Sequence, residues 1–141
     1  MPPTSTVETQ SQLERVAAGE GQYPVDAYEF VQRGLAFTVS RIHGQTRDAQ
    51  GNLAAEPRHH VSGRELCEGL RDFALLQWGL MSRAVLERWN IHGTIDFGRI
   101  VFIMVRHRFM LTSKDDTLAD FDSVYDFAKA FDAEYRISGG S

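Results

Sequence analysis

The distribution of proline is the sequence feature that most limits how this chain folds. All four prolines lie within the first 57 residues, at positions 2, 3, 24 and 57, and none occurs in the 84 residues from Arg58 onward. Proline removes a backbone donor and clashes with the preceding helical turn, so a long stretch without it permits uninterrupted helices. We therefore expect helices to dominate the second half of the chain.

The length and composition are typical of one globular domain. The chain has 141 residues, of which 43% are hydrophobic and 24% are charged. A chain of this length can bury a substantial core but seldom forms two domains, and disordered, collagen-like and coiled-coil chains have other compositions. The longest apolar run, from Ile100 to Val105, is much shorter than a membrane helix requires.

Helical periodicity and capping signals predict about six helices. They are expected near residues 5–18, 24–42, 62–78, 80–89, 94–105 and 118–135. The clearest start is the capping box of Ser62 and Glu65, in which each side chain pairs with the backbone amide of the other residue. Residues 100–105 also suit a buried strand, but their length and context favour a helix. The predicted fold is an all-α, compact single-domain bundle of about five to six short helices.

Two of these helices carry specific expectations about burial. In the helix over residues 80–89, the spacing directs Met81, Ala84, Val85 and Trp89 inward. The helix over residues 118–135 is expected to be continuous, with an apolar inner face and an acidic outer face.

Composition also suggests where the domain begins and ends. Residues 1–22 are expected to be a peripheral N-terminal segment, because the apolar set of their helix is thin. Residues 23–135 are expected to form the single helical domain, and residues 136–141 a frayed tail. Residues 43–60 are polar and rich in turn formers, which predicts a loop insertion, more often a tolerated surface insertion than a functional loop.

A combination of short motifs links this chain to one family. The motifs are His60-Val61-Ser62-Gly63-Arg64-Glu65-Leu66, Trp89-Asn90-Ile91, Thr94-x-Asp96-Phe97-Gly98 and Tyr125-Asp126-Phe127. Together they resemble a small uncharacterised family of bacterial proteins found mainly in planctomycetes and verrucomicrobia. The resemblance covers about residues 23–132. It implies a compact helical domain of bacterial origin and carries no activity.

Two residues depart from the pattern of that family, in which glycine stands at the positions of Asn90 and Arg108. Asparagine tolerates the left-handed conformation that closes helices, so the exchange at Asn90 is expected to be harmless. The arginine at position 108 argues against a tight turn directly after the fifth helix.

Chemically reactive residues are present, but no catalytic or metal-binding pattern joins them. His59 and His60 are adjacent, and no two histidines have the i, i+4 spacing of a helical zinc site. Cys67 has no CxxC partner, and a nucleophilic Gly-x-Ser-x-Gly turn and a glycine-rich phosphate loop are missing. We expect no metal, cofactor or small-molecule ligand and no enzymatic activity, although spacing in sequence does not exclude a pair of catalytic carboxylates.

The expected location is the cytoplasm, without a membrane partner. A single cysteine suits a reducing compartment, and the first residues lack the apolar stretch of a secretory signal.

Charge is distributed unevenly along the chain and indicates a candidate interaction surface. The net charge of −4 divides into −3 over residues 1–57, +3 over residues 58–111 and −4 over residues 112–141. Within the basic centre, Arg99 and Arg106 share a helix face with Phe102 and Ile103 between them. Arginine and aromatic side chains are typical anchors of protein interfaces. The aromatic side chain of Phe102 fits the core as well as an interface, and a core position is favoured for it. We expect Ile103 to be exposed, because a bundle of short helices covers an apolar helix incompletely.

The resulting functional hypothesis is a non-enzymatic protein-interaction or self-association module. Its predicted partner-binding residues are Arg99, Phe102, Ile103 and Arg106, and its partner is another protein or a second copy of the chain. The alternative is a winged-helix-like nucleic-acid-binding protein in which Arg99 and Arg106 contact phosphates. The acidic total charge and the scarcity of lysine place this alternative second.

Overall fold

The computed structural model describes residues 4–43, 61–110 and 117–131. These residues form six α-helices and two short 3₁₀ helices, and they contain no β-strand. The elements are α1 (Thr4–Glu20), α2 (Val25–His43), α3 (Gly63–Trp78), η1 (Gly79–Met81), α4 (Ser82–Arg88), α5 (Thr94–Arg106), η2 (Leu118–Phe121) and α6 (Phe127–Phe131). The predicted all-α bundle is confirmed, and residues 100–105 are helical. A winged-helix arrangement is not confirmed, because the described residues supply no strand for a wing.

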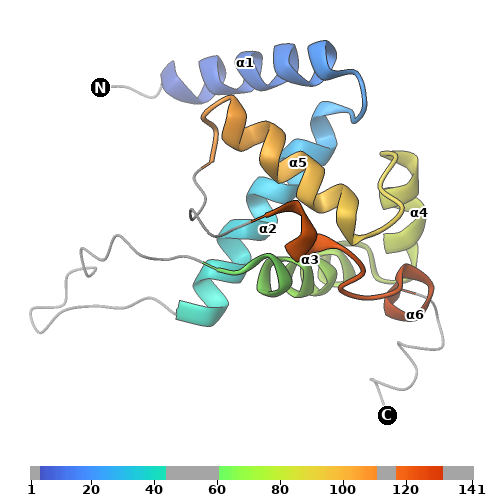
Figure 1. The fold of residues 1–141 in the computed structure, drawn as a ribbon. Coiled ribbons are helices and arrows are strands. Elements are labelled where there is room, and N and C mark those ends of the chain that lie inside the picture. Colours follow the sequence, from blue (N-terminus) through green and yellow to red (C-terminus); the bar gives the residue numbers. More distant parts are fainter. Residues whose placement is uncertain (1–3, 44–60, 111–116, 132–141) are drawn as a thin grey trace, which may run out of the picture.

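The helices surround one core that is centred on α2. This helix packs along α3 and also contacts α1 and α5, while η2 packs on α5. Figure 1 shows α1 at the top of the bundle, α5 in front of α2, and α6 at the bottom. Each α-helix contributes to the same buried cluster, which includes Leu13, Val31, Leu70, Leu86, Ile100 and Phe131. The first helix therefore shares the core of the rest of the chain through Leu13 and Ala17.

Two glycines allow α2 and α3 to pack closely. A Cβ atom on Gly34 would lie 2.1 Å from Cδ2 of Leu70, and one on Gly69 would lie 1.8 Å from Oγ1 of Thr38. Real Cβ contacts are essentially never this short, so a side chain at position 34 would displace the end of Leu70, and one at position 69 would overlap Cβ of Thr38 and push the helices apart.

The predicted capping box at the start of α3 is confirmed. The amide of Ser62 donates to Oε1 of Glu65 at 2.9 Å, and the amide of Glu65 donates to Oγ of Ser62 at 3.0 Å. The two bonds satisfy amides that have no partner inside the helix.

Helices α4 and α5 end in the same way, on a left-handed residue that is not glycine. Asn90 has φ 67° after α4, and Arg108 has φ 68° after α5. In each turn the next amide reaches back five residues, from Ile91 to Leu86 O at 2.9 Å and from Phe109 to Met104 O at 2.8 Å. The left-handed cap expected at Asn90 is confirmed. The argument against a tight turn after α5 is wrong, because Arg108 adopts the left-handed conformation and the turn forms.

The fourth helix differs from its prediction in its start and in its buried face. Gly79 adopts φ 52° and ends α3, and residues 79–81 form η1 before α4 begins at Ser82. Ser82 and Leu86 are buried, whereas Met81 is 61% exposed and Ala84 is also exposed. The hydroxyl of Ser82 lies 2.9 Å from Ala74 O. With Ser82 held inward by this contact, α4 buries a different face from the one that apolar spacing predicts.

The predicted continuous helix over residues 118–135 is wrong in its first part. The chain forms η2, leaves it in an extended conformation at Asp122 (ψ 124°), turns through Ser123 (φ 54°), and starts α6 at Phe127. The amide of Val124 donates to Oγ1 of Thr94 at 3.0 Å, and the amide of Ala128 donates to Oδ1 of Asp126 at 2.8 Å. These bonds anchor the break and cap a new helix. His43, the first residue of the predicted loop at 43–60, is instead the last residue of α2, and residues 44–60 lie outside the described residues, as do the predicted tail at 136–141 and the end of the last helix.

Candidate functional site

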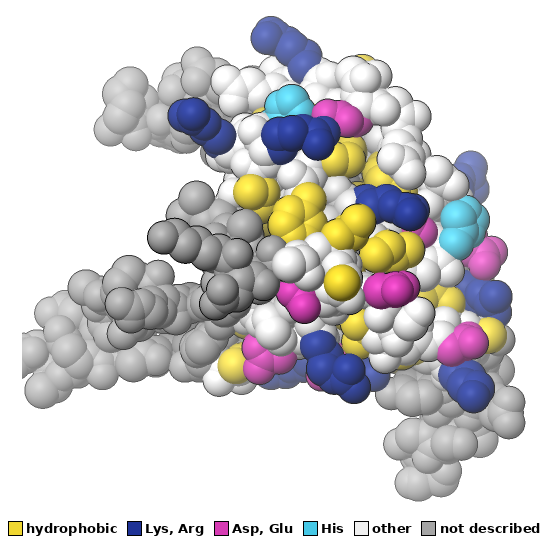
Figure 2. All heavy atoms as spheres, viewed as in Figure 1, with side chains coloured by type: hydrophobic (Ala, Val, Ile, Leu, Met, Phe, Trp, Pro, Cys, Tyr) yellow, Lys and Arg dark blue, Asp and Glu magenta, His cyan; other side chains and the backbone are white. Residues whose placement is uncertain are grey.

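The four predicted partner-binding residues all lie on α5, but they do not form one exposed patch. Ile103 is only 7% exposed, so the expected exposure of this side chain is wrong. Helices α2 and α3 and η2 pack against α5 and cover it on several sides. Phe102 is half-buried and meets the ring of Phe121 edge to face at 6.1 Å. Figure 2 shows hydrophobic side chains gathered over α5, with Lys or Arg side chains beside them.

Both arginines of α5 are bound to carboxylates of the same chain. Nη1 of Arg99 donates to Oδ1 of Asp96 at 3.1 Å, and Nη2 of Arg106 donates to Oε2 of Glu20 at 2.7 Å. The hydrogen bonds from His107 and Arg106 hold the pKa of Glu20 below its ordinary value. The pair of Arg99 and Asp96 lies within α5, whereas the pair of Arg106 and Glu20 links α5 to α1.

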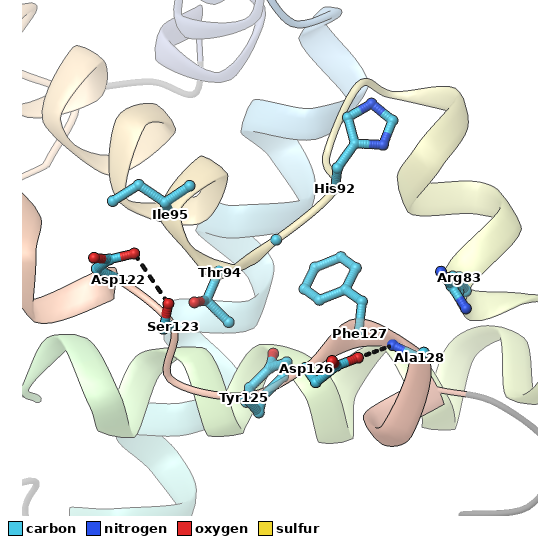
Figure 3. A pocket seen from close by; sticks show the side chains of 11 residues that line it. Arg83, His92, Thr94, Ile95, Asp122, Ser123, Tyr125, Asp126, Phe127 and Ala128 are labelled. Carbon is cyan, nitrogen blue, oxygen red and sulfur yellow. Dashed lines mark hydrogen bonds between the residues drawn. The ribbon is translucent and has the colours of Figure 1, made fainter.

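One cleft in the described part of the chain is lined by more polar than apolar surface. It has a volume of about 450 Å³ and lies between the turn before α5 and the segment before α6 (Figure 3). Its lining residues include Arg83, His92, Thr94, Asp122, Ser123 and Asp126. A serine, a histidine and carboxylates in one cleft raise the question of nucleophilic catalysis.

The hydrogen bonds of this cleft hold the segment before α6 in place and do not join a nucleophile to a base. The hydroxyl of Thr94 donates to Phe121 O at 2.6 Å, and the Ser123 hydroxyl donates to the neighbouring Asp122 at 3.2 Å. Nε2 of His92 lies 3.0 Å from Oδ1 of Asn90. A nucleophile needs a base within hydrogen-bond distance, and here serine and histidine are each engaged with another residue.

Cys67 and the metal-ligating residue types also lack the setting of an active site. Burial raises the pKa of the Cys67 thiol to about 12, so the thiol stays protonated at neutral pH and is a poor nucleophile. Within residues 4–43, 61–110 and 117–131, no three His, Cys, Asp or Glu side chains lie close enough together to hold a metal ion.

Three exposed apolar side chains lie within six residues of chain, where α3 gives way to α4. We call this segment, with Leu76, Leu80 and Met81, the α3–α4 edge. The three residues are 72%, 58% and 61% exposed. Only two other large hydrophobic side chains in the described residues are exposed, Ile42 at 41% and Leu118 at 40%. Leu76, Leu80 and Met81 are therefore the most exposed large apolar side chains of the described residues.

An aromatic groove lies between α2, α3 and the end of α4. One of its residues is a sequence neighbour of the α3–α4 edge. The groove has a volume of about 220 Å³, and Trp78, between Leu76 and Leu80 in the chain, is one of its walls. The lining residues are Asp26, Glu29, Phe30, Arg33, Phe73, Gln77, Trp78 and Trp89. Phe30 packs against the other rings, at centroid distances of 5.6 Å to Phe73, 5.3 Å to Trp78 and 6.0 Å to Trp89.

Helical periodicity does not reveal the α3–α4 edge or the aromatic groove, because it assigns Met81 and Trp89 to the core. A usable signal was present at Leu76. This large apolar residue stands off the predicted inner face of its helix, which contains Leu70 and Phe73. Leu80, two residues beyond the predicted end of that helix, is a second exposed apolar side chain.

Comparison of this chain with protein-family models, curated proteins and solved structures finds no match. The resemblance to the bacterial family therefore stays a prediction. None of the helices in the described ranges is both long and apolar enough to cross a membrane.

Proposed function

We propose that this chain is a non-enzymatic protein-interaction module that binds a polypeptide partner through the α3–α4 edge. The observation that carries this proposal is the exposure of Leu76, Leu80 and Met81, each more than half accessible, within six residues of chain. Several large apolar side chains exposed in one short segment indicate a candidate interaction site. Trp78 adjoins the edge, and tryptophan is among the residues that most often anchor interfaces.

The chemistry of the edge favours a polypeptide over a nucleic acid. Phosphate binding needs several available cations, whereas the arginines predicted to provide them, Arg99 and Arg106, are held by Asp96 and Glu20. An apolar edge gains more from apolar side chains of a partner than from a phosphate backbone. We place this module in the bacterial cytoplasm, an assignment supported by the single cysteine and by the motif resemblance.

Charge substitutions at the edge test this function. Leu76→Lys and Leu80→Lys should abolish cross-linking to the partner in the native cell, because burial of a lysine ammonium opposes docking. The matched control is Ile42→Lys, which adds the same charge at an exposed apolar residue of α2. This control should retain the partner. Circular dichroism melting of the purified variants checks that each one folds.

The oligomeric state is measured on the same variants by light scattering. A wild-type dimer that becomes monomeric only in the edge variants would identify a second copy as the partner and support the proposal. The proposal is overturned if folded edge variants and the Ile42→Lys control cross-link to the same proteins in the same amounts as the wild type.

A further inference from the structure

We propose that the aromatic groove binds a methylated or quaternary ammonium group. The aromatic rings of Phe73, Trp78 and Trp89 are half-buried in its wall, and Phe30 is buried beneath them. Aromatic faces attract such cations because their π electrons give the face a partial negative charge, and tryptophan is the strongest partner. The inference goes beyond the proposed function, since it assigns a ligand chemistry to a site beside the edge.

The arrangement of the rings suits an ammonium group better than a flat ligand. Trp78 and Trp89 meet edge to face at 5.4 Å, with an angle of 80° between their planes. Phe30 is tilted by 33° to Trp78 and by 53° to Trp89. Rings at different angles present faces and edges in several directions along the groove, which suits a roughly spherical group, whereas a planar ligand prefers parallel faces. Methyl groups on nitrogen also supply apolar surface to these walls.

The charges at the rim complement a cation. Asp26 is exposed at the start of α2, and Glu29 lies one turn later. Arg33 is the one basic residue of the lining, so the groove has a formal net charge of −1. A carboxylate that already has a partner still adds negative potential at the rim. The low effective dielectric beside the aromatic walls strengthens the attraction of a bound cation.

The size of the groove limits the ligand to a small group or the end of a side chain. Its volume of about 220 Å³ is below the roughly 300 Å³ at which sites for drug-sized ligands begin. A trimethylammonium group with a short linker is of the appropriate size, and it can belong to a free small molecule or to a methylated lysine of a polypeptide. The shared chemistry is the methylated ammonium.

Intrinsic fluorescence reports directly on this site, because the only two tryptophans of the chain, Trp78 and Trp89, both line the groove. The full chain is titrated with choline chloride while sodium chloride is reduced to keep the ionic strength constant. The control ligand is 3,3-dimethylbutan-1-ol, which has the shape of choline without the charge. We expect a saturable change with choline and weaker binding of the neutral alcohol, by about fivefold or more.

Three charge variants determine whether the groove is the site. Asp26→Asn removes a rim carboxylate and should weaken choline binding by about threefold, and Arg33→Gln should strengthen it by a similar factor. Asp122→Asn, in the polar cleft, makes the same chemical change elsewhere and should leave the dissociation constant unchanged. Opposite effects of Asp26→Asn and Arg33→Gln cannot arise from a general loss of folding.

Two peptides distinguish the sources of the ammonium group. One short peptide contains trimethyllysine, and its counterpart contains unmodified lysine. A ligand carried by a polypeptide is supported if the methylated peptide binds at least about tenfold more tightly than choline and than the unmodified peptide. Choline binding equal to or tighter than that of the peptide supports a free cation. The proposal is overturned if choline and the neutral alcohol bind equally. It is also overturned if Asp26→Asn and Arg33→Gln have no effect, or if neither fluorescence nor saturation-transfer NMR detects saturable binding.

The ligand of the groove and the partner of the edge can be tested separately. Leu76→Lys and Leu80→Lys alter residues outside the lining of the groove. Loss of the protein partner with choline binding retained supports both proposals. Failure of choline binding while the edge variants still lose the partner overturns only the ligand assignment.

Discussion

The hydroxyl of Tyr23 donates a 2.5 Å hydrogen bond to a carboxylate oxygen of Asp96, joining the connection between α1 and α2 to the first turn of α5. Asp96 is 7% exposed and also accepts bonds from the amide of His92 at 2.8 Å and from Arg99 at 3.1 Å. Burial, and then the bond to Asp96, raise the pKa of Tyr23 well above its ordinary value, so the hydroxyl remains a donor at neutral pH. A buried carboxylate with three donors is a rigid link between elements distant in sequence.

Two tyrosines five residues apart predict opposite effects of the same substitution. Tyr23→Phe removes a donor from the buried carboxylate and should lower the free energy of unfolding by about 1.5–3 kcal/mol. The hydroxyl of Tyr28 is buried and has no hydrogen-bond partner among the described residues. Tyr28→Phe should therefore be neutral or stabilising, within about 0.5–1 kcal/mol. Urea unfolding of both variants measures the contrast, and equal destabilisation by the two would contradict it.

The close packing of α2 and α3 predicts that an added methyl group destabilises the protein at Gly69. Alanine is favoured over glycine in a helix by about 1 kcal/mol, but here its Cβ would overlap Thr38. We expect Gly69→Ala to lower the free energy of unfolding by about 1–3 kcal/mol, the usual effect of overpacking.

The control is Gly19→Ala in α1, where nothing lies within 4 Å of the new Cβ atom. This change should stabilise the protein by about 0.5–1 kcal/mol. Thermal unfolding of the two variants separates the effects. A stabilising Gly69→Ala would show that α2 and α3 can move apart at little cost.

The helices are predictable from the sequence because their signals are local. The capping box of Ser62 and Glu65 spans one helical turn, and the apolar spacing of α2 extends over its whole length. The break before α6 is not predictable in this way, because Val124 is held by Thr94, thirty residues earlier in the chain. No periodicity within residues 118–135 reports that contact.

The candidate site is less predictable for a related physical reason. Whether an apolar side chain is buried depends on which elements surround its helix, and this information is tertiary. Ile103 is covered because α2, α3 and η2 pack around α5. Met81 is exposed because the turn at Gly79 and the contact of Ser82 with Ala74 rotate the start of α4.

The two left-handed caps predict different responses to glycine. Arg108→Gly relieves the strain of a side chain at φ 68° and should stabilise the protein by about 0.5–1 kcal/mol. Asn90 already tolerates this conformation, and its Nδ2 donates to Gln22 O at 3.1 Å. Asn90→Gly loses that bond and should bring no gain, or a loss of up to about 1 kcal/mol. Chemical denaturation gives both values. A gain at Asn90 as large as that at Arg108 would mean that the Gln22 bond contributes nothing.

The contact of Glu20 with His107 and Arg106 predicts that acid loosens α1 from α5. The pKa of Glu20 is lowered in the folded protein, mainly by the hydrogen bond from His107 and then by that from Arg106. Its stabilising contribution is therefore complete above the ordinary value of 4.5, and it is lost as the pH falls through 4.5 and then through the lower folded-state pKa. Glu20→Gln should destabilise the protein at pH 7, and the difference from the wild type should disappear in acid.

Unfolding curves at a series of pH values from neutral to about 3, a range that spans carboxylate titration, measure this difference. Hydrogen exchange of the α1 amides shows whether the loss is local to that helix. Glu14→Gln is the matched control, because it removes the same charge from an exposed position of α1. Its difference from the wild type should stay small throughout. A Glu20→Gln difference that persists unchanged in acid would show that the link between α1 and α5 does not depend on the ionised carboxylate.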